Sequence, residues 1–231
     1  MFLIVIVIGF TIISYSVNAR LKSKFKKYSQ ISLSSGISGK EAAEKMLRDN
    51  GIHDVQVMSV EGQLTDHYNP AKKTVNLSSD VYHGRSAAAV AVAAHEVGHA
   101  VQHAQAYSFL ELRSALVPLQ NVSAKIINFV FMAMLFGAFF IQGLFSFELA
   151  MMVIIGCYTV FTLFAFITLP VEYDASKRGL AWMTSSGVTT SQEHDMAKDS
   201  LKWAARTYLV AAIGSLVTLL YYVMMFMGSR D

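Results

Sequence analysis

Two histidines and a glutamate fall within five positions of the chain, in the sequence HEVGH at residues 95–99, inside an apolar run that predicts a helix. Positions i and i+4 share one face of a helix, so His95 and His99 can bind the same ion. Glu96 would lie beside that ion and take a proton from a coordinated water, as in zinc peptidases. The alternative is a chance match on a solvated helix face. It would leave three polar side chains among alanines and valines, where burial without partners is costly.

The rest of the chain has the composition of a membrane protein. Of its 231 residues 54% are hydrophobic, and four apolar segments approach the length of about 20 residues that crosses a bilayer. No positive charge precedes the first segment and a basic cluster follows it, which favours an uncleaved anchor over a signal peptide. The sequence therefore predicts four transmembrane helices, at residues 2–17, 126–145, 149–169 and 208–227.

Positive charge is distributed unevenly around these segments. With the N-terminus outside, residues 18–125 and 170–207 share one side and hold 13 and 5 of the 19 lysines and arginines, and only Arg230 lies opposite. Basic residues favour the cytoplasmic side, so we expect a multi-pass protein of the cell membrane with both polar regions in the cytoplasm. The basic residues are not interleaved with aromatic ones, so nucleic acid is not an expected partner. The single cysteine, Cys157, excludes an intramolecular disulfide.

The polar region before the HEVGH sequence predicts a small α+β domain. A capping-box pattern at Ser38 begins a short amphipathic helix, and Asn50-Gly51 ends it. Ser86 is the expected cap of the histidine-containing helix. Strands are expected between these two helices, near residues 55–60, 63–68 and 73–77.

Two prolines are expected to limit helices. Pro118 should break an amphipathic helix over residues 107–124, and Pro170 should end the hairpin of the second and third spans. Residues 171–207 would then form two helices around Ser185-Ser186-Gly187. The chain is thus divided into an anchor, a cytoplasmic domain with the HEVGH helix, a transmembrane hairpin, a cytoplasmic helical segment, and a last span with its tail. The bounds are 1–19, 20–125, 126–169, 170–207 and 208–231.

Two histidines leave a catalytic zinc ion one protein ligand short, because such sites normally have three protein ligands and a water. His103 continues the i+4 series, but on a straight helix its Cα lies about 12 Å along the axis from that of His95. Glu172 and Asp174 are better placed, since they follow the third span on the side where the histidines must be. In a helix their side chains diverge by about 200°, so only one should face the ion.

Three stretches of the chain resemble the YugP-type bacterial membrane zinc metallopeptidases: residues 62–70, 86–102 and 172–176. The layout is also similar to that of the HtpX-like gluzincins, in which a glutamate on a later helix, within a Glu-x-x-Ala-Asp pattern, is the third ligand. The resemblance therefore implies that Glu172 completes the metal site and that Ala175 marks a close helix contact. It implies Zn²⁺ as the cofactor. Ser176 replaces the final Asp of the pattern, so Asp174 is the candidate that would orient an imidazole.

A second polar cluster lies at His67 and Tyr68, just before a turn. Either side chain could donate to the oxyanion of a tetrahedral intermediate, or Asp66 and His67 could merely organise the Asn69-Pro70 turn. The strand at residues 73–77 could bind an extended substrate by strand addition. It could equally be an interior strand.

Together these features predict a mostly α membrane protein with four transmembrane helices and a small cytoplasmic α+β zincin-like peptidase domain. The expected function is hydrolysis of peptide bonds in membrane or membrane-proximal proteins by a zinc-activated water, with Glu96 as general base. Two alternatives are a non-catalytic membrane scaffold with a structural metal and a protease that cleaves within the membrane. The apolar run before His95 is too short to span, which counts against the latter. Homo-oligomer formation is left open.

Overall fold

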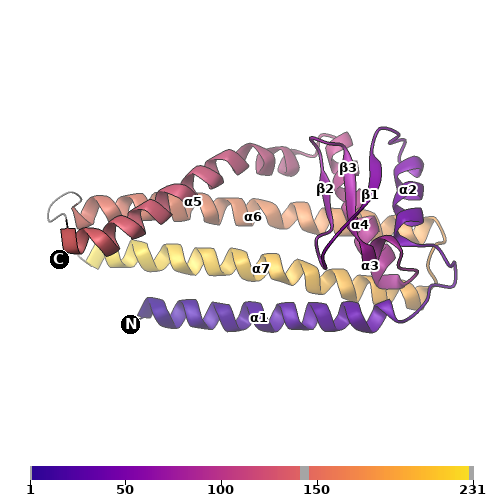
Figure 1. Ribbon diagram of the computed structural model, residues 1–231, viewed down its shortest axis with the longest axis horizontal. Coiled ribbons are helices and arrows are strands. Elements are labelled where there is room, and N and C mark those ends of the chain that lie inside the picture. The colour runs from indigo at the N-terminus through magenta and orange to yellow at the C-terminus, as the bar shows by residue number, and fades with distance from the viewer. Residues whose placement is uncertain (1, 141–145, 229–231) are drawn as a thin grey trace. The chain divides into compact units, whose positions relative to one another are not determined.

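The structure is a computed structural model that describes residues 2–140 and 146–228 (Figure 1). Its long helices are α1 (Phe2–Ser29), α5 (Ser108–Phe140), α6 (Phe147–Ser185) and α7 (Ser191–Gly228). Between α1 and α5 lie α2 (Gly39–Asp49), β1 (Gln56–Val60), β2 (His67–Asn69), β3 (Thr74–Ser78), α3 (Ser79–Tyr82) and α4 (Ala87–Ala104). The chain divides into two units. We call Met1–Ser14, Leu112–Leu169 and Tyr208–Asp231 the helical unit, and Tyr15–Glu111 and Pro170–Thr207 the mixed unit.

The helical unit is built from parts of the four long helices. Each of these helices is long and apolar enough to cross a membrane, which agrees with a multi-pass membrane protein. In the core of this unit Leu3, Ile127, Ile154 and Tyr222, one from each helix, pack in a single cluster. Residues 141–145 of the expected second span lie outside the described residues.

Neither proline limits a helix, contrary to the sequence-based expectation. Pro118 lies inside α5 and Pro170 lies inside α6. A proline removes one N–H donor from the helix ladder, but membrane-spanning helices tolerate this loss because neighbouring polar groups and local adjustments of the helix satisfy the freed carbonyl. As a consequence, the third apolar segment and the segment that carries Glu172 form one continuous helix. The expected interruption near Gly187 is confirmed, since α6 ends at Ser185 and α7 begins at Ser191.

The mixed unit confirms the helix caps that the sequence predicts. The backbone N–H of Glu41 donates to the Ser38 hydroxyl and the Glu41 carboxylate accepts from the Ser38 N–H, at 3.2 and 2.6 Å, so the capping box of α2 is complete. The hydroxyl of Ser86 accepts from the N–H of Ala89 at the start of α4. These bonds satisfy donors that a helix start otherwise leaves without partners.

A three-stranded sheet lies in the mixed unit, in the order β1-β3-β2. Strand β1 pairs with β3 in parallel (Val57 with Val75), and β2 pairs with β3 in antiparallel orientation (Tyr68 with Val75). Every residue of β3 is buried. The strand predicted at residues 73–77 is therefore an interior strand, and a substrate strand cannot add to it because both of its edges are already paired.

The second strand is shorter than the sequence suggests. Residues 63–66 form a loop, and only His67–Asn69 pair as β2. Leu64 has a φ of +58° and Gly62 has a φ of +98°, conformations that cannot continue an extended strand. The Asp66 carboxylate fixes the end of this loop by accepting from the backbone N–H of Ser78 at 2.7 Å and from its hydroxyl at 3.0 Å.

Candidate metal centre

Helix α4 places His95 and His99 side by side. Its alanine-rich sequence favours the helix, which packs against α2, α3, β2 and β3. The two imidazole rings have centroids 4.8 Å apart and are nearly perpendicular, at 82°. Both side chains are largely buried. The i, i+4 spacing thus brings two nitrogen ligands to one point of the helix surface.

Helix α6 crosses α4 at small residues, and this crossing delivers Glu172. A Cβ atom added to Gly98 would lie 2.5 Å from the carbonyl oxygen of Ala175, and one added to Gly179 would lie 3.0 Å from the carbonyl of Ala94. The two backbones are therefore nearly in contact. Glu172 lies one turn before Ala175 on α6, so its side chain reaches the histidines.

The three side chains have the spacing of a zinc site. Glu172 Oε2 lies 3.3 Å from His95 Nε2 and 3.7 Å from His99 Nε2, and the three ligand atoms all lie within 4.8 Å of one another. Tetrahedral ligands at zinc distances of about 2.0–2.2 Å would be about 3.3–3.6 Å apart. His95, His99 and Glu172 therefore fit a Zn²⁺ ion as a group of three protein ligands.

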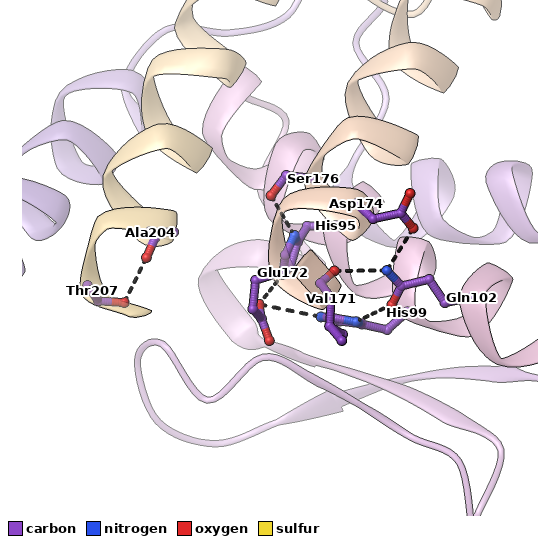
Figure 2. Close-up of polar contacts among 9 residues, drawn as sticks. All are labelled: His95, His99, Gln102, Val171, Glu172, Asp174, Ser176, Ala204 and Thr207. Carbon is purple, nitrogen blue, oxygen red and sulfur yellow. Dashed lines mark hydrogen bonds and ion pairs between the residues drawn. The ribbon is translucent and has the colours of Figure 1, made fainter. Parts of the chain in front are cut away.

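The Nδ1 atom of each imidazole contacts a polar side chain on the side away from Glu172. His95 Nδ1 lies 3.0 Å from the Ser176 hydroxyl, and His99 Nδ1 lies 3.0 Å from Gln102 Oε1 (Figure 2). Partners of this kind orient metal-binding histidines, and here they leave both Nε2 atoms directed at Glu172. Ser176, which departs from the resembled pattern, thus has a direct contact with a candidate ligand.

Asp174 lies further from the histidines than we expected. Its carboxylate accepts a hydrogen bond of 2.8 Å from Gln102 Nε2 and pairs with Arg178. It therefore acts on His99 through Gln102. Sequence reasoning missed Gln102, although a polar residue three positions after a candidate ligand on an apolar helix is a usable signal.

Charge is concentrated in the buried site. Burial alone would raise the pKa of Glu172, but the neighbouring imidazoles of His95 and His99 outweigh it and hold the pKa of this carboxyl well below its usual range. Burial would lower the pKa of His99, yet the neighbouring Glu172 and Glu96 raise it. Negative charge on Glu172 is thus stabilised at the position where a cation would be bound.

Glu96 has a different environment. It does not belong to the group of three ligands, and among the described residues its carboxylate has no hydrogen-bond partner. Burial raises its pKa, and the two histidines only partly oppose this effect. A carboxyl group with a raised pKa beside the ligands suits proton transfer near neutral pH.

His67, Tyr68 and His103 lie outside the group of three ligands. The Tyr68 hydroxyl is 3.0 Å from His103 Nδ1, and His67 Nδ1 is 2.8 Å from the carbonyl oxygen of Thr65. Strand β2, which carries His67 and Tyr68, does contact α4. His103 is thus a partner of Tyr68, and the geometry gives it no place among the ligands.

We predict that Gly98→Ala weakens zinc binding. The new Cβ would collide with the Ala175 backbone, so α6 must move and carry Glu172 with it. Overpacking costs about 1–3 kcal/mol and outweighs the gain of up to about 1 kcal/mol from alanine in a helix. Zinc affinity should fall at least about 10-fold, the lower range for disturbed support of a metal ligand. Zinc titration and thermal unfolding of the purified protein measure both effects.

Gly156→Ala is the matched control for this prediction. Gly156 lies in α6. Apart from its chain neighbours and the nearby backbone of the same helix, no heavy atom lies within 4 Å of an added Cβ. This variant should keep the zinc affinity of the unaltered protein. Equal zinc affinities for Gly98→Ala and Gly156→Ala would show that the close crossing does not position Glu172.

Comparisons with known proteins identify one protein family. The chain matches, over residues 3–227, the model of a family described as "Putative neutral zinc metallopeptidase". It is 41% identical over 220 residues to the "Putative membrane protease YugP" of Bacillus subtilis (strain 168), and the match covers 95% of this chain and 94% of that protein. No solved structure matches the chain.

Proposed function

The chain belongs to the YugP-type family of membrane zinc metallopeptidases, and on this premise we propose that it is a zinc-dependent endopeptidase with a gluzincin-type site. The observation that carries the proposal is the convergence of His95, His99 and Glu172 beside the buried carboxylate of Glu96. A group of three protein ligands leaves a coordination position open, as in catalytic zinc sites, whereas structural sites use four protein ligands. This difference favours an enzyme over a scaffold.

Each residue of the centre has a distinct task in this proposal. His95, His99 and Glu172 hold the ion. When bound, Zn²⁺ lowers the pKa of a water molecule to about 7 and polarises the scissile carbonyl. Glu96 accepts the proton of the attacking water on its carboxylate and then transfers it to the nitrogen of the leaving amine. The raised pKa of Glu96 makes the first transfer easier, because a carboxylate with a higher pKa is a stronger base.

Tyr68 and His67 remain the proposed donors to the oxyanion. Burial raises the pKa of the Tyr68 hydroxyl, so the group stays protonated and can donate at neutral pH. In the described structure this hydroxyl lies 3.0 Å from His103 Nδ1. To donate to an oxyanion, the Tyr68 hydroxyl must therefore exchange His103 for the substrate oxygen when substrate is bound.

The proposed substrates are polypeptides of membrane or membrane-proximal proteins. Because β3 is interior, an extended substrate would have to pair with an edge strand. β2 is an edge strand and contacts the helix that carries His95 and His99. We therefore assign substrate pairing to the free edge of β2, where main-chain hydrogen bonds would hold the peptide.

Metal removal tests the proposed activity. We expect the full chain, purified in detergent, to cleave an unfolded protein substrate such as casein. Treatment with 1,10-phenanthroline should abolish cleavage, and added Zn²⁺ should restore it. Atomic absorption should find one zinc per chain in the active preparation. Cleavage that persists in protein shown to be free of metal would refute the proposal.

We also propose that the centre faces the cytoplasm. The mixed unit combines both polar stretches of the chain, Tyr15–Glu111 and Pro170–Thr207, and the positive charge concentrated there favours the cytoplasmic side. Single cysteines at Ser35 and Ser146, in a Cys157→Ser background, test this orientation. On intact cells an impermeant thiol reagent should label position 146 and spare position 35. Labelling of position 35 alone would reverse the topology.

A further inference from the structure

Gln102 is the most completely enclosed polar side chain of the candidate centre. Its exposed fraction is 0%, and it lies three residues after His99 on α4. Its Oε1 is 3.0 Å from His99 Nδ1, while its Nε2 donates to the Val171 carbonyl and to Asp174 Oδ2, each at 2.8 Å (Figure 2). All three contacts are short enough for good hydrogen bonds.

These contacts determine the orientation of the Gln102 amide. The Val171 carbonyl can only accept, and the Asp174 carboxylate, which also accepts from Arg178, is an acceptor as well. A flipped amide would turn its oxygen toward two acceptors and lose both bonds. The NH₂ group must therefore face α6, and the amide oxygen must face His99.

The amide orientation in turn determines the protonation of His99. An amide oxygen only accepts, so His99 Nδ1 must carry the hydrogen. Nε2 is then the ring nitrogen left for a metal ion, and it lies 3.7 Å from the Glu172 carboxylate. His95 differs, because its partner is the Ser176 hydroxyl, which can donate or accept and so imposes no tautomer.

We infer that Gln102 is a positioning residue that fixes the tautomer and ring orientation of His99 and so prepares Nε2 to bind zinc. The inference rests on the proposed function, since it presumes that the centre binds zinc. Asp174 and the Val171 carbonyl contribute by holding the Gln102 amide in place. Because outer partners of ligating histidines contribute about 10–100-fold to metal affinity, loss of Gln102 should weaken zinc binding by that factor.

The test compares Gln102→Met with Gln105→Met in the full chain, purified in detergent. Methionine keeps the volume of glutamine and removes its hydrogen bonds. Gln105 is the exposed C-cap residue of α4, and among the described residues its side chain has a hydrogen bond only with Arg178, so it is the control that does not contact His99. Competition with a chelating dye should show zinc binding weakened about 10–100-fold in Gln102→Met and unchanged in Gln105→Met.

A further readout separates positioning from packing. At saturating Co²⁺, the visible spectrum of the bound ion should differ from that of the unaltered protein in Gln102→Met but not in Gln105→Met. Unaltered Co²⁺ spectra, or equal zinc affinities in Gln102→Met and the unaltered protein, would overturn the inference. Failure of the unaltered protein to bind zinc would instead refute the proposed function.

Discussion

A Glu172→Ala protein is expected to lose both its zinc and its peptidase activity. Glu172 is 3% exposed, and its carboxylate lies 3.3 and 3.7 Å from the Nε2 atoms of His95 and His99. Without it, two imidazoles would remain for an ion that catalytic sites hold with three protein ligands. The loss of affinity should therefore exceed the roughly 10–100-fold that outer partners contribute. Zinc content after dialysis and cleavage of an unfolded substrate measure the two effects.

Asp174→Ala is the control for this experiment. Asp174 is also an acid on α6, two residues away, but its carboxylate contacts Gln102 and Arg178 and neither imidazole. Its loss leaves the Val171 carbonyl as a partner of the Gln102 amide, so zinc affinity should fall by about 10–100-fold at most. If Glu172→Ala retained a full equivalent of tightly bound zinc, Glu172 would not be a ligand.

Local features of the site follow directly from the sequence. The Ser86 cap and the i, i+4 spacing of His95 and His99 depend on neighbouring residues only, and α4 forms where these signals place it. The four apolar segments are similarly evident, because segment length and hydropathy suffice to identify helices that could cross a membrane. The sequence wrongly predicts breaks at Pro118 and Pro170, because the rule that proline ends a helix holds for soluble helices and not for these long apolar ones.

Contacts between distant segments could not be predicted in this way. The approach of Glu172 to His95 depends on the crossing of α4 and α6 at Gly98 and Ala175. The separation of these two residues along the chain does not indicate that they meet in the fold. Only the family resemblance pointed to Glu172 in preference to Asp174. Gln102 was missed because its role depends on acceptors from α6. The interior position of β3 likewise depends on strand order, which short alternating patterns do not determine.

The second large effect is expected for Glu96→Gln, which should abolish hydrolysis while zinc remains bound. Glutamine has the size of glutamate but cannot accept and return a proton. Positioned proton transfer contributes about 10²–10⁴-fold to rate, so kcat should fall by at least this factor. The three candidate ligands are unchanged, so zinc content should stay at one per chain. Single-turnover rates and metal analysis on the same preparation measure both quantities.

The matched control is the same chemical change at Glu111, an exposed acid of the mixed unit. Glu111→Gln should keep both zinc and activity, because this carboxylate is not one of the candidate ligands. The burial that raises the pKa of Glu96 also makes the neutral glutamine easy to accommodate there, so misfolding is not expected to account for lost activity. A Glu96→Gln protein that cleaves at the unaltered rate would exclude Glu96 as the base. One that loses its zinc would instead assign Glu96 to metal binding, and the base would have to be another residue.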